Sequence, residues 1–267
     1  MASPRVGAVL LAGGRASAGL AAAGGSENKA LADIHGWPMV RYVWEALARA
    51  ETVAHRVLVS DERVRQALGV REGEWCPCSG GPVDNIVSGA EALPDTVTHV
   101  LIVSCDTPLV RPADLDGFVG ASLDLGVSLC YSVLDQRTCT GAFAGVRKTW
   151  VRVREGTLAG GNLALVSRPF LVDHQDRVRQ AFELRKSPFA LAMRLGITFA
   201  LSVVLGRFLP IRVGIAVVEQ RAQRLLGCDV KALVLPSPEP GIDVDKPEDL
   251  EFVRGLLEPR PPGATGA

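Results

Sequence analysis

The chain has 267 residues, 48% of them hydrophobic, and it carries 29 basic and 29 acidic side chains. This length and apolar content suit a large folded domain and exclude a wholly disordered chain. A formal charge of zero excludes a general electrostatic attraction to nucleic acid, so any site for an anion must be local.

The first expected element is a strand that ends in a glycine corner. Residues 6–11 form a short apolar run rich in β-branched side chains, as in a strand buried on both faces of a parallel sheet. Gly13 and Gly14 follow, and glycines there let backbone N–H groups approach phosphate oxygens. Lys29 could bring a positive charge to the same anion. The alternative is an ordinary turn between a strand and a helix.

Strand-like and helix-like segments alternate through the first half of the chain. The expected strands are 6–11, 56–60, 99–103 and 127–133, and the expected helices are 38–50, 61–68, 82–93 and 112–125. This order predicts an α/β fold of three layers, with a doubly wound, mostly parallel sheet.

Asp106 follows the strand expected at 99–103, with only Ser104 and Cys105 between them. Ligands of open α/β sheets bind beyond the carboxyl ends of the strands, so Asp106 is expected at the mouth of a site. A carboxylate there suits Mg²⁺ or Mn²⁺, whose other ligands are phosphate and water. The alternative is that Asp106 only caps its loop.

The segment 138–226 is expected to be an insertion or lid. Gly160, Gly161 and Asn162 are interpreted as a second glycine-rich turn, and 147–153 as a strand. Lys148 would suit an anionic ligand, although a basic cluster is more often a solvated surface.

The apolar stretch 189–211 lies within this insertion. Its uninterrupted part, 197–205, is too short to span a membrane, and a covering helix, a lipid-facing wall and a homodimer interface all stay open. Residues 1–258 are expected to form one domain, and 259–267 a disordered tail.

Two aspartates precede the last expected helix. Asp243 and Asp245 alternate along an extended segment and therefore face the same side. Pro247 suits the first position of a helix. The alternative is that Asp245 is the N-cap of this helix, with Glu248 closing a capping box.

Taken together, these segments resemble the MobA-like nucleotidyltransferases, the NTP transferase domain family. The resemblance rests on 11–14, 29–31, 36–39, 105–109 and 243–250. It implies that the glycine loop and a lysine bind a nucleoside triphosphate, with a loop at 80–85 over the base. The implied nucleotide-binding residues are Leu11, Ala12, Gly13, Gly14, Lys29, Gly81, Asp84, Asn85 and Asp106. The implied metal ligands are Asp106, Asp243 and Asp245.

The expected reaction transfers a nucleoside monophosphate from the triphosphate to a phosphate or hydroxyl of a small acceptor and releases pyrophosphate. Lys29, Asp106 and Arg15 are the expected catalytic residues, with Mg²⁺ or Mn²⁺ as cofactor. The acceptor side would comprise Gly160, Gly161, Asn162 and Lys148. Neither nucleic acid nor a membrane-spanning segment is expected.

One departure from the family pattern favours a different function. The family carries an arginine a few residues after the glycines, where this chain has Ala18. A guanidinium is well suited to phosphate, so its loss favours a regulatory protein that binds nucleotide without turnover, unless Arg15 substitutes. A glycosyltransferase of the GT-A type is the other alternative, but its paired aspartates would follow a central strand.

The cysteines indicate a reducing compartment. The closest pair, Cys76 and Cys78, lacks the two-residue gap of zinc and redox motifs. Reduced cysteines and a cytoplasmic location are therefore expected.

Overall fold

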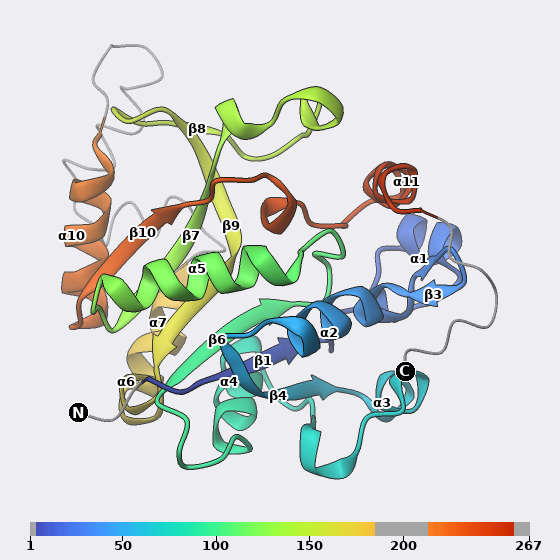
Figure 1. Ribbon diagram of the computed structural model, residues 1–267, viewed down its shortest axis with the longest axis horizontal. Helices are drawn as coiled ribbons and strands as arrows, with labels where there is room; N and C mark the ends of the chain where they lie inside the picture. The colour runs from blue at the N-terminus through green and yellow to red at the C-terminus, as the bar shows by residue number, and fades with distance from the viewer. Residues whose placement is uncertain (1–3, 185–212, 259–267) are drawn as a thin grey trace.

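The computed structural model describes residues 4–184 and 213–258 (Figure 1). Its main sheet has eight described strands, in the order β10-β7-β9-β6-β1-β4-β5, with β8 paired to β9 off this path. The strands are β1 (Val6–Leu11), β4 (Val53–Ser60), β5 (Trp75–Pro77), β6 (His99–Ser104), β7 (Leu129–Asp135), β8 (Val151–Arg152), β9 (Thr157–Ser167) and β10 (Val230–Val234). A separate hairpin joins β2 (Asp33–Ile34) to β3 (Trp37–Pro38).

The sheet is mostly parallel. Strand β1 pairs in parallel with both β4 and β6, and the outer pairs β4–β5 and β7–β10 are parallel as well. Strand β9 is antiparallel to its neighbours β6 and β7. The expected α/β fold with a doubly wound, mostly parallel sheet is therefore confirmed.

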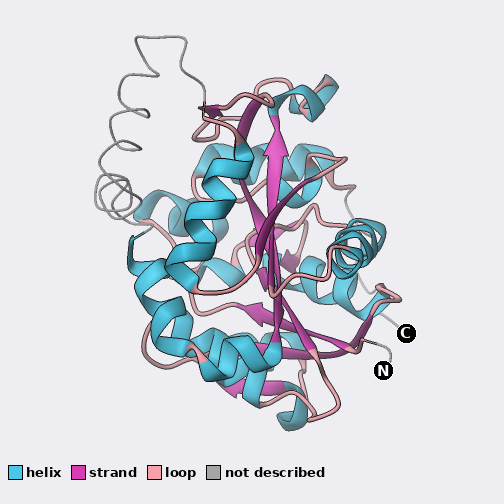
Figure 2. Cartoon of the chain, turned by 90° about the vertical axis from the view of Figure 1, so that its left-hand side faces the viewer, coloured by secondary structure: helices cyan, strands magenta, loops and turns pink. Residues whose placement is uncertain are grey.

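Helices cover both faces of this sheet and give three layers (Figure 2). One core cluster packs α2 (Met39–Arg49) and α5 (Pro112–Asp124) on the first face, through side chains such as Val43 and Leu115. A second cluster packs four helices on the opposite face: α4 (Pro82–Glu91), α6 (Arg168–Asp173), α7 (Gln175–Leu184) and α10 (Ile215–Leu226). A third lies under α1 (Ala18–Gly24) and α11 (Pro247–Leu256). The remaining helix, α3 (Glu62–Leu68), follows β4.

Three helices begin with the same local device. Helices α4, α5 and α11 each start at a proline, and the aspartate two residues later accepts the N–H of the N-cap residue. Proline fits the first helical position, and an acidic side chain there also complements the helix dipole. In α11 the N-cap is Lys246, and Asp249 closes the box. The alternative role of Asp245 as N-cap is therefore wrong, and its carboxylate is left for other contacts.

Residues 160–162 lie within β9, so the expected glycine-rich turn is wrong. A Cβ built on Gly161 would stand 2.2 Å from Ser132 Oγ on the neighbouring strand, so only glycine fits this close approach. Of the strand expected at 147–153, only Val151–Arg152 is formed.

The segment expected as an insertion contributes a central strand, because β9 lies between β6 and β7. This part of 138–226 belongs to the sheet core. The apolar stretch 189–211 and the tail 259–267 lie outside the described residues.

Two further observations concern the described residues. None of their helices combines the length and hydropathy that crossing a membrane requires. All six cysteines are free of disulfide bonds.

Candidate active site

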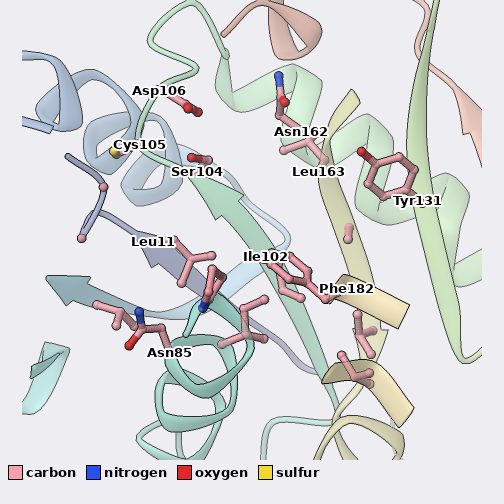
Figure 3. A pocket seen from close by; sticks show the side chains of 18 of the residues that line it. Leu11, Asn85, Ile102, Ser104, Cys105, Asp106, Tyr131, Asn162, Leu163 and Phe182 are labelled. Atoms are coloured by element: carbon pink, nitrogen blue, oxygen red, sulfur yellow. The ribbon is translucent and has the colours of Figure 1, made fainter. Parts of the chain in front are cut away.

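A cavity of about 1020 Å³ opens at the carboxyl ends of β1 and β6. Its wall runs from the glycine corner after β1, past Asp106, to β9 and β7 (Figure 3). This is the edge where ligands of open α/β sheets bind, and the volume lies at the upper end of the usual range for small-molecule sites.

The glycine corner after β1 is fixed by a hydrogen bond to β4 and by close packing against Cys78. Ala12 is fully buried, and its N–H donates to the carbonyl of Val59 at 2.8 Å. Ala12 thus anchors the corner and does not line the cavity, whereas Leu11, Gly13, Gly14 and Arg15 do. A Cβ on Gly13 would stand 3.1 Å from Cys78, while Gly14 has open space around it. The corner therefore exposes backbone to the cavity at Gly14.

Lys29 joins the two aspartates that the sequence places far apart. Its Nζ donates to Asp106 Oδ2 at 2.7 Å and also to Asp245 Oδ1. Burial alone would lower the pKa of Lys29, but Asp106 and then Asp245 outweigh it, so the pKa is raised and the ammonium is kept charged. The backbone N–H of Lys29 donates to Gly14 O at 3.0 Å, which ties this ion-pair centre to the glycine corner.

A second lysine holds Asp243. Lys148 Nζ lies 2.6 Å from Asp243 Oδ1 and also donates to the carbonyl of Gly241. Burial raises the pKa of Asp243 although Lys148 opposes it, and the nearby Asp106 and Asp245 carboxylates add to the rise. Burial would also raise the pKa of Asp245, but its hydrogen bond from Lys29 outweighs this and lowers it. Three carboxylates and Lys29 thus line the cavity, and Lys148 pairs with Asp243 from outside it.

The carboxylates of Asp106 and Asp245 fit a divalent cation whose remaining ligands come from substrate phosphates and water. Asp106 Oδ1 is buried and has no hydrogen-bond partner among the described residues, so one carboxylate oxygen stays open to a ligand. In the described parts of the chain, no cluster of three histidine, cysteine or acidic side chains has metal-binding geometry. Mg²⁺ needs only one or two protein carboxylates beside phosphate and water, and Asp106 with Asp245 supplies two. Lys29 at present neutralises both.

The loop before α4 forms another part of the cavity wall. Gly80 adopts a left-handed conformation at φ +66° and lines the cavity with Asn85. Asp84 and Gly81, both expected to bind nucleotide, do not line it. Asp84 accepts the Gly81 N–H at 2.7 Å and pairs with Arg179 of α7 at 2.6 Å, so it holds the loop in place.

The acceptor-side residues divide in the same way. Gly161 and Asn162 line the cavity, whereas Gly160 and Lys148 do not. Lys148 is occupied by Asp243 and Gly241, so it offers no free charge to an anionic acceptor.

Comparison with known proteins agrees with this architecture. The model of the MobA-like NTP transferase domain matches residues 8–180. The chain belongs to this family. The match covers the glycine corner, Lys29, Asp106 and β9, but not Asp243 or Asp245.

Several relatives are similar over different lengths. A 2-C-methyl-D-erythritol 4-phosphate cytidylyltransferase of Frankia casuarinae is 33% identical over 130 residues, which cover 46% of each chain. A 3-deoxy-manno-octulosonate cytidylyltransferase of Anaeromyxobacter sp. (strain K) is 28% identical, covering 86% of this chain and 91% of that one. A solved hypothetical transferase from Thermus thermophilus is 34% identical, with a TM-score of 0.77, covering 92% of this chain and 99% of that one. The similarity to the solved transferase therefore extends over most of the chain.

The arginine that the family resemblance implies a few residues after the glycine corner is replaced by Ala18. Ala18 begins α1, whose N-cap Ser17 accepts from Leu20 N–H, and it does not line the cavity. Arg15 lines the cavity and is exposed, so it is the described arginine that can reach a bound anion.

Three polar residues of the site were not predicted from the sequence. Tyr131 and Ser104 line the cavity, and Arg179 holds Asp84. Ser104 directly precedes the Cys105-Asp106 pair and could have been found from the strand end alone. Tyr131 and Arg179 carry no such signal, because their places depend on the register of β7 against β9 and on the docking of α7.

Proposed function

We propose that the protein is a Mg²⁺-dependent nucleotidyltransferase that transfers a nucleoside monophosphate from a nucleoside triphosphate to a small acceptor and releases pyrophosphate. The observation that carries the proposal is the convergence of Lys29, Asp106 and Asp245 beside the glycine corner in a member of the MobA-like family. Mn²⁺ is the expected substitute for Mg²⁺.

The triphosphate is proposed to lie against Gly13 and Gly14, with the base near Gly80 and Asn85. Asn85 Oδ1 already accepts the Ser79 N–H at 2.8 Å, so its amide nitrogen is left to donate to the base. The Asn85 amide can donate a hydrogen bond to a carbonyl oxygen or to a ring nitrogen of a base, and cytosine has both acceptors. Because the curated relatives named above are cytidylyltransferases, CTP is the proposed donor.

The acceptor oxygen attacks the α-phosphorus in line, a new P–O bond forms, and the bond to the β-phosphate breaks with its electron pair leaving on pyrophosphate. A bound Mg²⁺ would polarise the phosphates and offset the charge on the leaving group. Asp106 and Asp245 would hold that ion, and Lys29, released from them, would turn its ammonium to the phosphates. Positioning and charge then supply the catalysis, and no covalent enzyme intermediate forms.

Two alternative functions lack a supporting observation. The paired aspartates of a GT-A glycosyltransferase are expected after a central strand, whereas Asp243 and Asp245 follow β10 at the edge of the sheet. The absence of an arginine at position 18 favoured a protein that binds nucleotide without turnover. Arg15 lines the cavity and can supply a guanidinium to the phosphates in its place.

The test is pyrophosphate release from CTP, GTP, ATP and UTP with Mg²⁺ and a panel of alcohols and phosphates. We expect release that prefers CTP and that falls by about 10²–10³ in Asp106→Asn, the loss typical of removing one key electrostatic group. Asp95→Asn is the matched control, because the Asp95 side chain is fully exposed away from the cavity. Equal rates for Asp106→Asn and Asp95→Asn would overturn the assigned role.

A further inference from the structure

The cavity continues well past the charged centre along one face of the sheet. Strand register places Ile102 of β6, Ala164 of β9 and Tyr131 of β7 opposite one another. The next row on the same face holds Val166 and Leu129. Directly paired residues point to the same side of a sheet, so these side chains form a continuous floor.

This floor changes character along its length. Its end near Asp106 is polar, with Ser104 and Asn162, while the rows below are apolar apart from the Tyr131 hydroxyl (Figure 3). From Asn162 to Val166 is four residues, which spans about 13 Å along a strand. We call the part beyond Ser104 and Asn162 the apolar chamber.

Helix α7 forms the opposite wall of the chamber. Val178 and Phe182 line it, and Figure 3 shows Phe182 beside Ile102, well away from Asp106. Ile102, Leu129, Ala164, Val178 and Phe182 are all only partly buried. The chamber therefore retains apolar surface that a ligand could cover.

The described cations of the cavity wall lie at one end of the cavity. Among the lining residues in 4–184 and 213–258, the cations are Arg15 and Lys29, and both belong to the phosphate end. Moving an anion into apolar surroundings without a counterion is strongly unfavourable. An acceptor with a charged sugar body would thus lose its hydration in the chamber and would find no cation among the described residues there to pair with.

The polar end offers a place for one reacting group. Asn162 Nδ2 donates to the carbonyl of Pro240 at 3.3 Å, which leaves Oδ1 to accept a hydroxyl proton. Resting on the nucleotidyl transfer proposed above, we infer that the acceptor is an alcohol with an elongated apolar body. Its hydroxyl lies between Asn162 and the α-phosphate, and its apolar body fills the chamber.

The step balances without a further reactant. The alcohol oxygen bonds to the α-phosphorus, pyrophosphate leaves with the electron pair of the broken bond, and the hydroxyl proton passes to water at the cavity mouth. The product is a nucleoside monophosphate ester of the alcohol.

The test fills the chamber without removing any charged group. In Ala164→Phe the new ring enters the chamber, and Ala121→Phe is the matched control, because Ala121 is a partly buried alanine on α5, on the opposite face of the sheet. Binding of the neutral fluorescent probe N-phenyl-1-naphthylamine and of CTP is measured in each protein. We expect Ala164→Phe to weaken the probe about tenfold or more, since close-packed interiors have no spare room, and to leave CTP binding unchanged.

Transfer is then compared with 1-octanol and with ribose 5-phosphate as acceptors. We expect product from octanol in the wild type and in Ala121→Phe, and none in Ala164→Phe. The acceptor inference would be wrong if the three proteins bound the probe equally, or if ribose 5-phosphate gave a product whose yield Ala164→Phe left unchanged. Either result would leave the proposed nucleotidyl transfer standing. Absence of CTP binding in the wild type would overturn the proposed function, and the acceptor assignment with it.

Discussion

Replacing Lys29 with methionine is expected to move metal binding and turnover in opposite directions. Methionine has a similar length and no charge, so the substitution removes the ammonium with little change in volume. In the resting protein Lys29 neutralises Asp106 and Asp245. A divalent ion that binds before nucleotide must therefore displace it.

The size of the effect follows from the two contacts. A hydrogen bond to a charged group contributes about 1.5–3 kcal/mol, and Asp106, whose side chain is 17% exposed, can supply that amount. Asp245 is 62% exposed, so its contact is screened and adds about 0–1 kcal/mol. In Lys29→Met the ion no longer has to break the contact between Lys29 and Asp106. Each 1.4 kcal/mol saved in this way lowers the Kd for the ion about tenfold. We expect Mn²⁺ to bind roughly 10- to 100-fold more tightly.

The assay is titration of free Mn²⁺ by electron paramagnetic resonance, without nucleotide. Lys231→Met is the matched control, because Lys231 pairs with Glu219 at 2.8 Å outside the cavity. Turnover with CTP should fall in Lys29→Met although the metal binds better, since the ammonium is then missing from the phosphates. Mn²⁺ affinity that is unchanged or weaker in Lys29→Met would show that Lys29 does not compete with the metal for Asp106.

Three other predictions use the same structure. Gly161→Ala should lower the free energy of unfolding by about 1–3 kcal/mol in chemical denaturation, because its Cβ would overlap Ser132. Gly14→Ala should leave stability unchanged, since Gly14 has only open space around it. The added methyl group would stand where the triphosphate is proposed to lie, so nucleotide binding measured by calorimetry should weaken; unchanged affinity would contradict a phosphate site there. Asp114→Asn should cost about 1 kcal/mol at neutral pH, or roughly 2–4 °C in thermal unfolding. Burial opposes ionisation of Asp114, but hydrogen bonds from Arg111 and Ser237 outweigh it and lower its pKa, so its contribution is present above the usual aspartate range. The difference from wild type should therefore be constant above about pH 5 and vanish as acid protonates Asp114; a difference that grows in acid would contradict this assignment.

The parallel half of the fold was predictable from the sequence. Its strands are short apolar runs, and Pro82, Pro112 and Pro247 mark helix starts that local chemistry decides. The meeting of Asp106 with Asp245 was also predictable, because both follow strands whose carboxyl ends share one edge of the sheet.

The central position of β9 was not predictable. Gly160 and Gly161 are typical of a turn, and only the pairing of this part of β9 with β7 makes them strand residues. The same long-range register sets Tyr131 opposite Ala164 and so creates the chamber floor. Local patterns carry no information about which distant strands become neighbours, and the acceptor side depends on that.

The position of Lys29 was foreseen only in part. The sequence predicted a lysine near phosphate, whereas the structure places its ammonium between two carboxylates. Lys29 is 77 residues from Asp106 and 216 residues from Asp245 in the chain, so only the packing of the three segments brings the ammonium between the two carboxylates.

The anomalous signal of manganese in crystals of the protein with Mn²⁺ and a non-hydrolysable CTP analogue would locate the metal directly. We expect a peak between the carboxylates of Asp106 and Asp245, with Lys29 Nζ turned to the phosphates beside Gly13 and Gly14. A peak elsewhere, or Lys29 still bridging the two aspartates while nucleotide is bound, would show that these residues do not form the proposed metal and phosphate site.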